Sequence, residues 1–336
     1  MRELIHENNL PYRVGGLLYT PALNKSIGDK LVRNEIQYLS SLVFCLEDSI
    51  EDKSLPAAEN QLKSTLLFLK TSNASLPLLF VRIRSVDHLK HIHYLLGNTE
   101  DILTGYVLPK FDLSNSTEYC QLIKEYNRER EKTLYIMPIL ESQTVADIGN
   151  RVDVLWQIKN QLDDIHEYVL NVRVGGNDLS NMYGLRRKAT QNIYQIGVIR
   201  DILVNIINVF ASNYIVSGPV WEYFGSDPEG EWATGLRKEI ELDLLNGFVG
   251  KTAIHPSQLP IIYEGLKVTQ SDYEDALNIL DWDNGGLAVS KSFSGDRMNE
   301  VKCHSRWAKR IVALANIYGI KEEKREDNSE QRLAKQ

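Results

Sequence analysis

The chain has 336 residues, of which 43% are hydrophobic and 25% are charged, as is typical of a globular protein that buries a full core. Its formal net charge of −7 argues against broad binding to nucleic acid or to anionic membranes, because that binding needs basic patches. The 3 cysteines are far apart and show no CxxC spacing, so neither a zinc site nor a disulfide framework is predicted.

Segments that would direct the chain to or across a membrane are not found in the sequence. It contains no run of about 18 uninterrupted apolar residues, which a membrane-spanning helix requires. Residues 1–9 carry charges and lack the apolar centre of a secretory signal. We therefore expect a cytoplasmic protein in a reducing compartment.

Short apolar runs alternate along the chain with longer stretches of helical character. The runs predicted as strands are 16–19, 42–46, 78–81, 105–108, 134–137, 168–174, 214–216 and 247–250. The clearest helical stretches are 24–40, 56–70, 190–212 and 231–246. Continuous apolar runs are typical of strands that are buried on both faces, and eight of them with intervening helices predict a (β/α)8 TIM barrel. The alternative is a doubly wound open sheet, which usually has fewer strands and a Gly-rich turn after the first strand, a turn that is missing here.

Three regions are predicted from the order of these elements. The barrel is expected at 10–267 and a C-terminal helical extension at 268–320, where Gly319 is a plausible helix stop. Residues 321–336 are almost all charged or polar, and we expect this tail to be disordered.

Charged residues follow most of the predicted strands. In a parallel barrel the active site lies at the C-terminal ends of the strands, so these residues should meet at one rim. They are Glu47, Asp48, Arg82, Arg84, Lys110, Glu141, Asp178 and Lys251.

Two of these carboxylates are candidate metal ligands. Glu141 directly follows an apolar strand, and Asp178 ends a Gly-Gly-Asn-Asp turn in which small residues let the backbone approach a ligand. Two carboxylates from adjacent strand ends, with water at the other positions, suit Mg²⁺. The alternative is that Glu141 caps a helix and Asp178 is an ordinary turn residue.

The remaining charged residues have two readings each. Arg82 could bind a substrate carboxylate and face a developing enolate, or form a salt bridge to Glu47 or Asp48 across the rim, and the two roles are compatible. Lys110 could neutralise excess negative charge or be a solvated loop lysine. His255 precedes a proline at a helix start, which favours a structural role over that of a general base.

Seven segments, taken in order, resemble the citrate lyase beta-subunit-like family, which belongs to the HpcH/HpaI aldolase superfamily of TIM barrels. These segments are 44–50, 79–85, 107–110, 139–142, 174–179, 250–258 and 297–300. Each is weak alone, but seven in the right order are specific. The resemblance implies a Mg²⁺-dependent carbon–carbon bond lyase (an aldolase) in which Glu141 and Asp178 hold the metal and Arg82 binds the substrate.

The same resemblance implies a small-molecule carboxylate or acyl-thioester substrate, specifically a β-hydroxy acid or its thioester. Glu47, Lys110 and Glu141 are expected to help Arg82 bind it. Asp48 and Glu300 are the candidate catalytic proton carriers, alongside Arg82 as a catalytic residue. We expect a homo-oligomer, a trimer or hexamer, in which Glu300 acts at a neighbouring subunit's site.

Three positions depart from the family pattern and leave the substrate open. Asn177 replaces a usual glutamate, Arg84 a usual asparagine and Glu300 a usual aspartate. One alternative is an acyl-thioester hydrolase that uses the same metal site. Another is a non-catalytic barrel that binds a metabolite.

Overall fold

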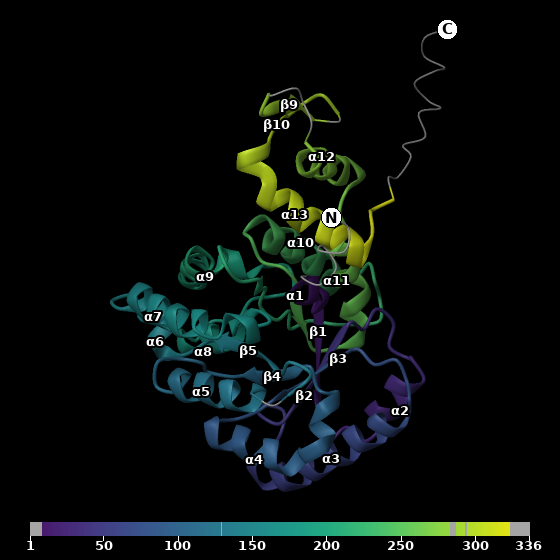
Figure 1. Cartoon of the computed structure of the whole chain (residues 1–336), viewed down its shortest axis with the longest axis vertical. Coiled ribbons are helices and arrows are strands. Elements are labelled where there is room, and N and C mark those ends of the chain that lie inside the picture. Colours follow the sequence, from purple (N-terminus) through teal and green to yellow (C-terminus); the bar gives the residue numbers. More distant parts are fainter. Residues whose placement is uncertain (1–8, 129, 283–286, 293, 323–336) are drawn as a thin grey trace. The chain divides into compact units, whose positions relative to one another are not determined.

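The computed structural model describes residues 9–128, 130–282, 287–292 and 294–322 (Figure 1). The described residues form two compact units, one that ends at residue 265 and one that begins at residue 266. Of the polar tail predicted at 321–336, all but the first two residues lie outside the described residues.

In the described part of the first unit, eight parallel strands form a nearly closed barrel, with the order β7-β6-β5-β4-β3-β2-β1-β8. The strands are β1 (Gly16–Pro21), β2 (Ser41–Cys45), β3 (Leu78–Arg82), β4 (Gly105–Leu108), β5 (Tyr135–Leu140), β6 (Val172–Val174), β7 (Val216–Ser217) and β8 (Lys251–Ala253). Between β7 and β8 the Val249 N–H donates to the Val216 carbonyl at 2.8 Å, and a bridge joins Gly218 to Lys251. This ring confirms the predicted TIM barrel and rules out the open sheet.

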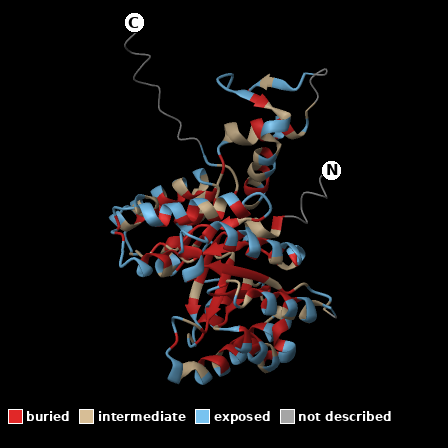
Figure 2. Cartoon of the chain, turned by 90° about the vertical axis from the view of Figure 1, so that its left-hand side faces the viewer, coloured by how far each residue is buried: buried red, intermediate tan, exposed pale blue. Residues whose placement is uncertain are grey.

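Helices and short 3-10 turns connect the strands on the outside of the ring. The α-helices are α1 (Leu10–Arg13), α2 (Ile27–Val32), α3 (Leu55–Thr71), α4 (Val86–Leu96), α5 (Ser116–Asn127), α6 (Gln143–Ala146), α7 (Arg151–Asp163), α8 (Gly176–Met182), α9 (Gly197–Phe210), α10 (Glu231–Leu245) and α11 (Leu259–Leu266). The 3-10 helices are η3 (Asp52–Ser54), η4 (Gly97–Ile102), η5 (His166–Tyr168), η6 (Ile193–Gln195) and η7 (Pro256–Gln258). Figure 2 shows buried strands and helices that expose one side. In α3 the inward side is the stripe Ala58, Leu62, Leu66 and Leu69, whose spacing is helical.

Several predicted boundaries were wrong, and backbone geometry explains them. The eighth strand was expected at 247–250, but β8 is Lys251–Ala253. Gly247 and Gly250 have φ values of 97° and 78°, which are not compatible with a strand. The helix expected at 24–40 ends at Val32, since Asn34 then takes a left-handed φ of 53°. The sixth strand was predicted from 168 but begins at Val172, and residue 168 belongs to η5.

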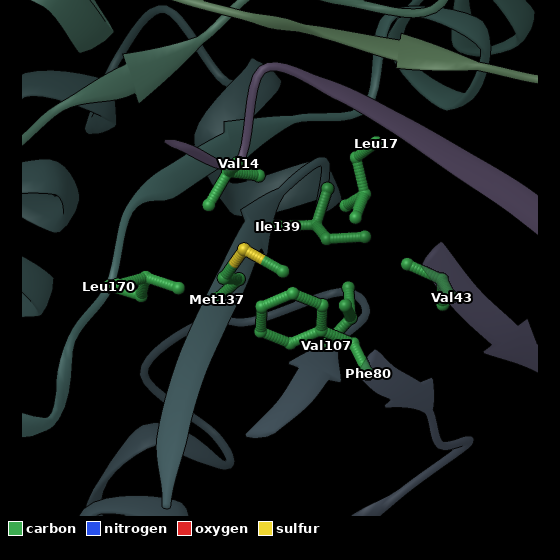
Figure 3. Close-up of a cluster of buried hydrophobic side chains, with 8 residues drawn as sticks. All are labelled: Val14, Leu17, Val43, Phe80, Val107, Met137, Ile139 and Leu170. Atoms are coloured by element: carbon green, nitrogen blue, oxygen red, sulfur yellow. The ribbon is translucent and has the colours of Figure 1, made fainter. Parts of the chain in front are cut away.

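The barrel interior is filled by apolar side chains up to the level of the site. Figure 3 shows this cluster, which consists of Val14, Leu17, Val43, Phe80, Val107, Met137, Ile139 and Leu170. Alternate strand residues face inward, so the next inward residues are Tyr19 on β1, Arg82 on β3 and Glu141 directly after β5. The apolar cluster therefore forms a floor beneath charged side chains.

The described part of the second unit contains two helices and an unpredicted hairpin. It comprises α12 (Gln270–Leu280), β9 (Val289–Lys291), β10 (Met298–Glu300) and α13 (Val301–Tyr318), with β9 and β10 antiparallel. The helices share an apolar cluster of Ala276, Ile279, Ala308 and Val312. The predicted helix stop is confirmed, because Gly319 follows α13 with a φ of 87°. Within the described residues, neither unit has a helix long and apolar enough to cross a bilayer.

Candidate active site

A cavity of about 320 Å³ opens at the C-terminal ends of the barrel strands. Its walls come from the ends of β1, β2, β3, β5, β6 and β8 and from the loops that follow them. Four of the residues predicted from sequence line it together, namely Asp48, Arg82, Glu141 and Asp178. This is the position that the barrel fold reserves for catalytic groups.

Glu141 is held at the cavity wall by its neighbours. Its side chain is only 2% exposed, and its Oε1 accepts a hydrogen bond of 3.0 Å from the Lys110 N–H. The Arg82 Nη2 lies 3.5 Å from the same oxygen. The pKa of Glu141 is raised to about 8, chiefly by burial; the charge of Arg82 opposes this rise and that of Asp178 adds to it. The carboxylate is therefore costly to ionise even beside Arg82, and a second cation would favour its charged form.

Gly175 lets the Glu141 side chain occupy this position. A Cβ at residue 175 would lie 1.9 Å from the Glu141 Oε2 and 2.4 Å from its Cβ, which no real side chain tolerates. Gly175 also lies between β6 and α8, whose first turn carries Asp178. The small residue therefore brings the β6 turn against the carboxylate that follows β5.

The donor set at this wall fits a hard divalent cation. Glu141 and Asp178 offer only oxygen atoms, which Mg²⁺ prefers, and their mutual repulsion is what such an ion would relieve. Among the described residues no group of three or more His, Cys, Asp and Glu side chains forms a metal site. Two carboxylates would leave the other positions of a Mg²⁺ ion to water and substrate.

Arg82 is surrounded by carboxylates. Its Nη2 lies 2.8 Å from the Glu47 Oε2, and its Nη1 donates to the Asp48 Oδ2 at 2.9 Å. Burial opposes the charge, but the Tyr19 phenol and Glu47 outweigh it and raise the pKa of Arg82. The salt bridges considered as the alternative for Arg82 are therefore both present.

Glu47 and Asp48 differ in how they hold a proton. Burial raises the pKa of Glu47, partly against the charge of Arg82. Burial also disfavours the charged form of Asp48, but its hydrogen bond with Glu47 and the charge of Arg82 outweigh this and lower the pKa of Asp48. Lys110 Nζ donates to the Glu47 Oε1 at 2.6 Å, which ties the loop after β4 to the pair. Of the two carboxyl groups, Asp48 therefore loses its proton more readily and Glu47 holds its proton more strongly.

Lys110 contacts the carboxylates of the site through both its backbone N–H and its ammonium group. It has a left-handed φ of 48°, which is uncommon for a residue with a side chain. Its N–H meets the Glu141 carboxylate and its Nζ meets Glu47. Backbone strain of this kind is common at functional sites, and here the contacts with Glu141 and Glu47 hold Lys110 in its strained conformation.

Two residues considered from sequence, Glu300 and Lys251, are not among those that line this cavity. Glu300 ends β10 in the second unit, where its Oε2 accepts from the Cys303 Sγ at 3.2 Å. Lys251, expected at the rim, is instead buried, with its Nζ 2.6 Å from the Asp243 Oδ2 and 3.0 Å from the Glu239 Oε1. The expected position of Lys251 at the rim was wrong because Lys251 is the first residue of β8, whereas the sequence placed it after the strand.

His255 and Arg84 have structural contacts. The Ser257 N–H donates to the His255 Nδ1 at 3.2 Å, so His255 caps η7, and its ring stacks on Phe224. Arg84 Nε donates to the Leu46 carbonyl at 2.7 Å, which braces the loop after β2. These contacts agree with the structural role predicted for His255.

Sequence reasoning missed three residues that line the cavity, Tyr19, Arg173 and Thr252. Arg173 was the one with a visible clue, because it is a lone charge within the apolar run 168–174. Its Nη2 donates to the Thr252 Oγ1 at 2.7 Å. The orientation of these side chains depends on strand register, which the sequence does not show.

Comparison with known proteins places the chain among barrels of similar architecture. A citrate lyase from Burkholderia xenovorans aligns with a TM-score of 0.68 at 13% identity, covering 92% of this chain and 94% of that one. CitE from Mycobacterium tuberculosis, solved with magnesium, acetoacetate and coenzyme A, aligns at 0.59 and 18% identity, covering 90% and 99%. RipC from Yersinia pestis aligns at 0.55 and 16% identity, covering 78% and 99%. At these identities the likeness shows the fold alone.

Curated proteins and family models gave two further findings. The comparison with curated proteins found no match. A family model described as C–C bond lyase of the TIM-barrel fold matches residues 8–320, which is most of the chain and includes every strand of the barrel. The chain therefore belongs to the family of C–C bond lyases with the TIM-barrel fold.

Proposed function

We propose that the chain is a Mg²⁺-dependent carbon–carbon bond lyase that acts on a β-hydroxy acid or its acyl thioester. The observation that carries the proposal is that Glu141, Asp178 and Arg82 line one cavity at the catalytic end of the barrel. Membership of the C–C bond lyase family supports it. So do the similar M. tuberculosis structures, one with magnesium, acetoacetate and coenzyme A and one with oxaloacetate and magnesium.

Each side chain has a defined task in this proposal. Glu141 and Asp178 would hold Mg²⁺, which when bound supplies a Lewis acid for a substrate oxygen. Asp48 takes the proton of the β-hydroxyl, the C–O bond becomes a carbonyl, and the electrons of the breaking carbon–carbon bond form an enolate. Arg82 stabilises the negative charge that develops on the enolate oxygen.

The remaining parts of the proposal concern binding and assembly. Glu47 and Lys110, joined at 2.6 Å, hold the loop that faces the substrate. We propose that Glu300 returns a proton to the enolate from a neighbouring subunit of a homo-oligomer, a trimer or hexamer. We also propose a cytoplasmic location and small-molecule partners.

Product analysis tests this function directly. The full chain is incubated with Mg²⁺ and with citryl-CoA, malyl-CoA, citrate or malate, and the products are identified by mass spectrometry. A lyase yields two carbon fragments, whereas a thioester hydrolase yields a free acid and coenzyme A. Failure of all four probes, or hydrolysis alone, would contradict the lyase assignment.

Variants connect the activity to the site. Glu141→Ala and Asp178→Ala should each lose on the order of 100-fold to 1,000-fold in turnover, as is usual when charge stabilisation is removed. Glu118→Ala is the matched control, because Glu118 is an exposed carboxylate on α5 that pairs with Lys90. Full activity in Glu141→Ala would reject the scheme.

A further inference from the structure

Arg173 is a fully buried cation at the inner end of the cavity. It lies on β6 opposite Ile139 of β5, and Ile139 belongs to the inward-facing core. Side chains of paired residues in a sheet share a face, so Arg173 also points into the barrel. It is 1% exposed and lines the cavity.

The guanidinium of Arg173 is left with few partners. Its Nη2 donates to Thr252, but its Nε and Nη1 have no hydrogen-bond acceptor within the described chain. No carboxylate of the described residues lies within ion-pair distance of it. Burial lowers the pKa of Arg173, and the Tyr19 phenol, which hydrogen-bonds with it, opposes this change. Burial also raises the pKa of Tyr19, so this phenol stays neutral and is not a counter-ion.

Arg82, the other arginine in the cavity, has the opposite environment. Three carboxylates surround it, with oxygens at 2.8 Å, 2.9 Å and 3.5 Å. Its charge is therefore balanced within the protein. A buried guanidinium without a counter-ion is costly unless an anion reaches it, so the uncompensated positive charge of the cavity belongs to Arg173.

We propose that Arg173 binds a carboxylate of the ligand at the inner end of the cavity. This inference rests on the proposed function: one end of the substrate is taken to bind at the metal site, and the carboxylate that Arg173 binds is a second acidic group at the other end. Gly175, against which Glu141 packs, directly follows β6 and is two residues after Arg173, so their backbones are about 7 Å apart at the usual rise of a strand. The substrate class is then a short diacid, about four to six carbons long, which a cavity of this size accepts.

A pair of probes that differ only at the second acidic group tests the proposal. Malate and 2-hydroxybutyrate share the α-hydroxy acid end, but malate ends in a carboxylate where 2-hydroxybutyrate ends in a methyl group. Each is titrated by calorimetry into the full chain with Mg²⁺. Malate should bind at least about tenfold more tightly, the usual effect of a hydrogen bond between charged groups.

Variants assign that preference to the arginine. Arg173→Met should bring the two affinities within about twofold, and Arg173→Lys should leave an intermediate preference, because lysine keeps the charge but loses the fork of donors. Arg200→Met is the matched control, since Arg200 is an exposed arginine on α9. If Arg173→Met does not fold, as judged by circular dichroism, the Lys variant and the wild-type ratio still decide the question.

The outcomes separate this inference from the proposed function. Equal binding of the two acids by the wild type, binding of neither at millimolar concentration, or a preference that survives both variants overturns the role of Arg173. A parallel Mg²⁺ titration reports on the metal site by itself. Loss of Mg²⁺ binding with an intact, Arg173-dependent malate preference would contradict the lyase proposal and leave this inference standing.

Discussion

At the scale of single residues, Glu141 and Gly175 share one small space. The Glu141 carboxylate can occupy its buried position because residue 175 has no side chain, and its high pKa of about 8 follows chiefly from that burial. A carboxylate in this state gains most when a cation arrives. The glycine is therefore as much a part of the proposed metal site as the two acids.

Gly175→Ala should weaken Mg²⁺ binding by at least about tenfold, because the new methyl group displaces a metal ligand. Calorimetric titration with Mg²⁺ measures the effect. Gly197→Ala is the matched control, since a Cβ at Gly197 would meet nothing within 4 Å. Equal affinity in Gly175→Ala and wild type would show that Glu141 does not need its present position.

The sequence alone predicted some residues of the candidate site, and there are physical reasons why it missed or misplaced the others. Glu141, Asp178 and Arg82 were predicted because they lie at the ends of strands or in the turns that follow them, and barrel geometry brings strand ends together. Arg173 was missed because its direction depends on register, and a shift of one residue would turn it outward. Lys251 was misplaced because nothing in the sequence shows that Gly250 has a positive φ.

At the scale of elements, β8 and α10 are joined by a buried charge network. Lys251 of β8 meets Glu239 and Asp243 of α10, and all three side chains are at most 4% exposed. Arg187 and Tyr194 complete the network through Glu239 and Asp243. This arrangement satisfies charges that would otherwise be costly in the interior.

Lys251→Met should lower the free energy of unfolding by about 3–5 kcal/mol, because it leaves two buried carboxylates without their cation. Urea unfolding followed by circular dichroism measures the change. Lys90→Met, which removes an exposed pair with Glu118, is the control and should unfold near the wild-type midpoint. A stable Lys251→Met variant would mean that the network is not needed to attach α10.

α3 and α4 are joined by a histidine that should make stability depend on pH. The Arg84 N–H donates to the His88 Nδ1 at 3.0 Å, and its Nε2 faces the Glu59 Oε1 of α3 at 3.0 Å, with His91 nearby. Burial lowers the pKa of His88, although the hydrogen bond with Glu59 opposes this. The folded chain therefore resists protonation of this ring more than the unfolded chain does.

The unfolded state binds more protons below its histidine pKa of about 6.5, so stability should fall as the pH drops below that value. Above it both states are neutral at this residue and the effect vanishes. His88→Gln should flatten the pH dependence between about pH 5 and 7 when urea midpoints are compared. An unchanged slope in His88→Gln would assign the effect to other groups.

The strands were predicted better than the elements after the barrel. β2 to β5 match their apolar runs closely, because strands buried on both faces are continuously apolar. The hairpin of β9 and β10 was missed, since most of its residues are exposed or half-buried and carry no apolar alternation. Such strands are defined by their pairing rather than by burial.

At the scale of the whole molecule, the family assignment and the barrel do not explain the predicted role of Glu300. Glu300 belongs to the second unit, at the start of α13. The resemblance assigns it to a neighbouring subunit's site. That role stays a prediction, which subunit mixing can test.

Mixing inactive Glu141→Ala and Glu300→Gln subunits after partial denaturation should restore lyase activity above the sum of the separate variants. Mixed oligomers would contain some sites with an intact Glu141 and a neighbour's intact Glu300. Size-exclusion chromatography confirms that the mixture reassembles. Reassembly without recovered activity would place Glu300 outside the shared site.

The most direct test of the whole account is an anomalous difference map from crystals grown with Mn²⁺ as a substitute for Mg²⁺. We predict one strong peak in the barrel cavity, with carboxylate oxygens of Glu141 and Asp178 both at about 2.0–2.3 Å from the ion. A cavity without a peak, or a peak bound by neither carboxylate, would contradict the central claim that these two acids hold a catalytic metal.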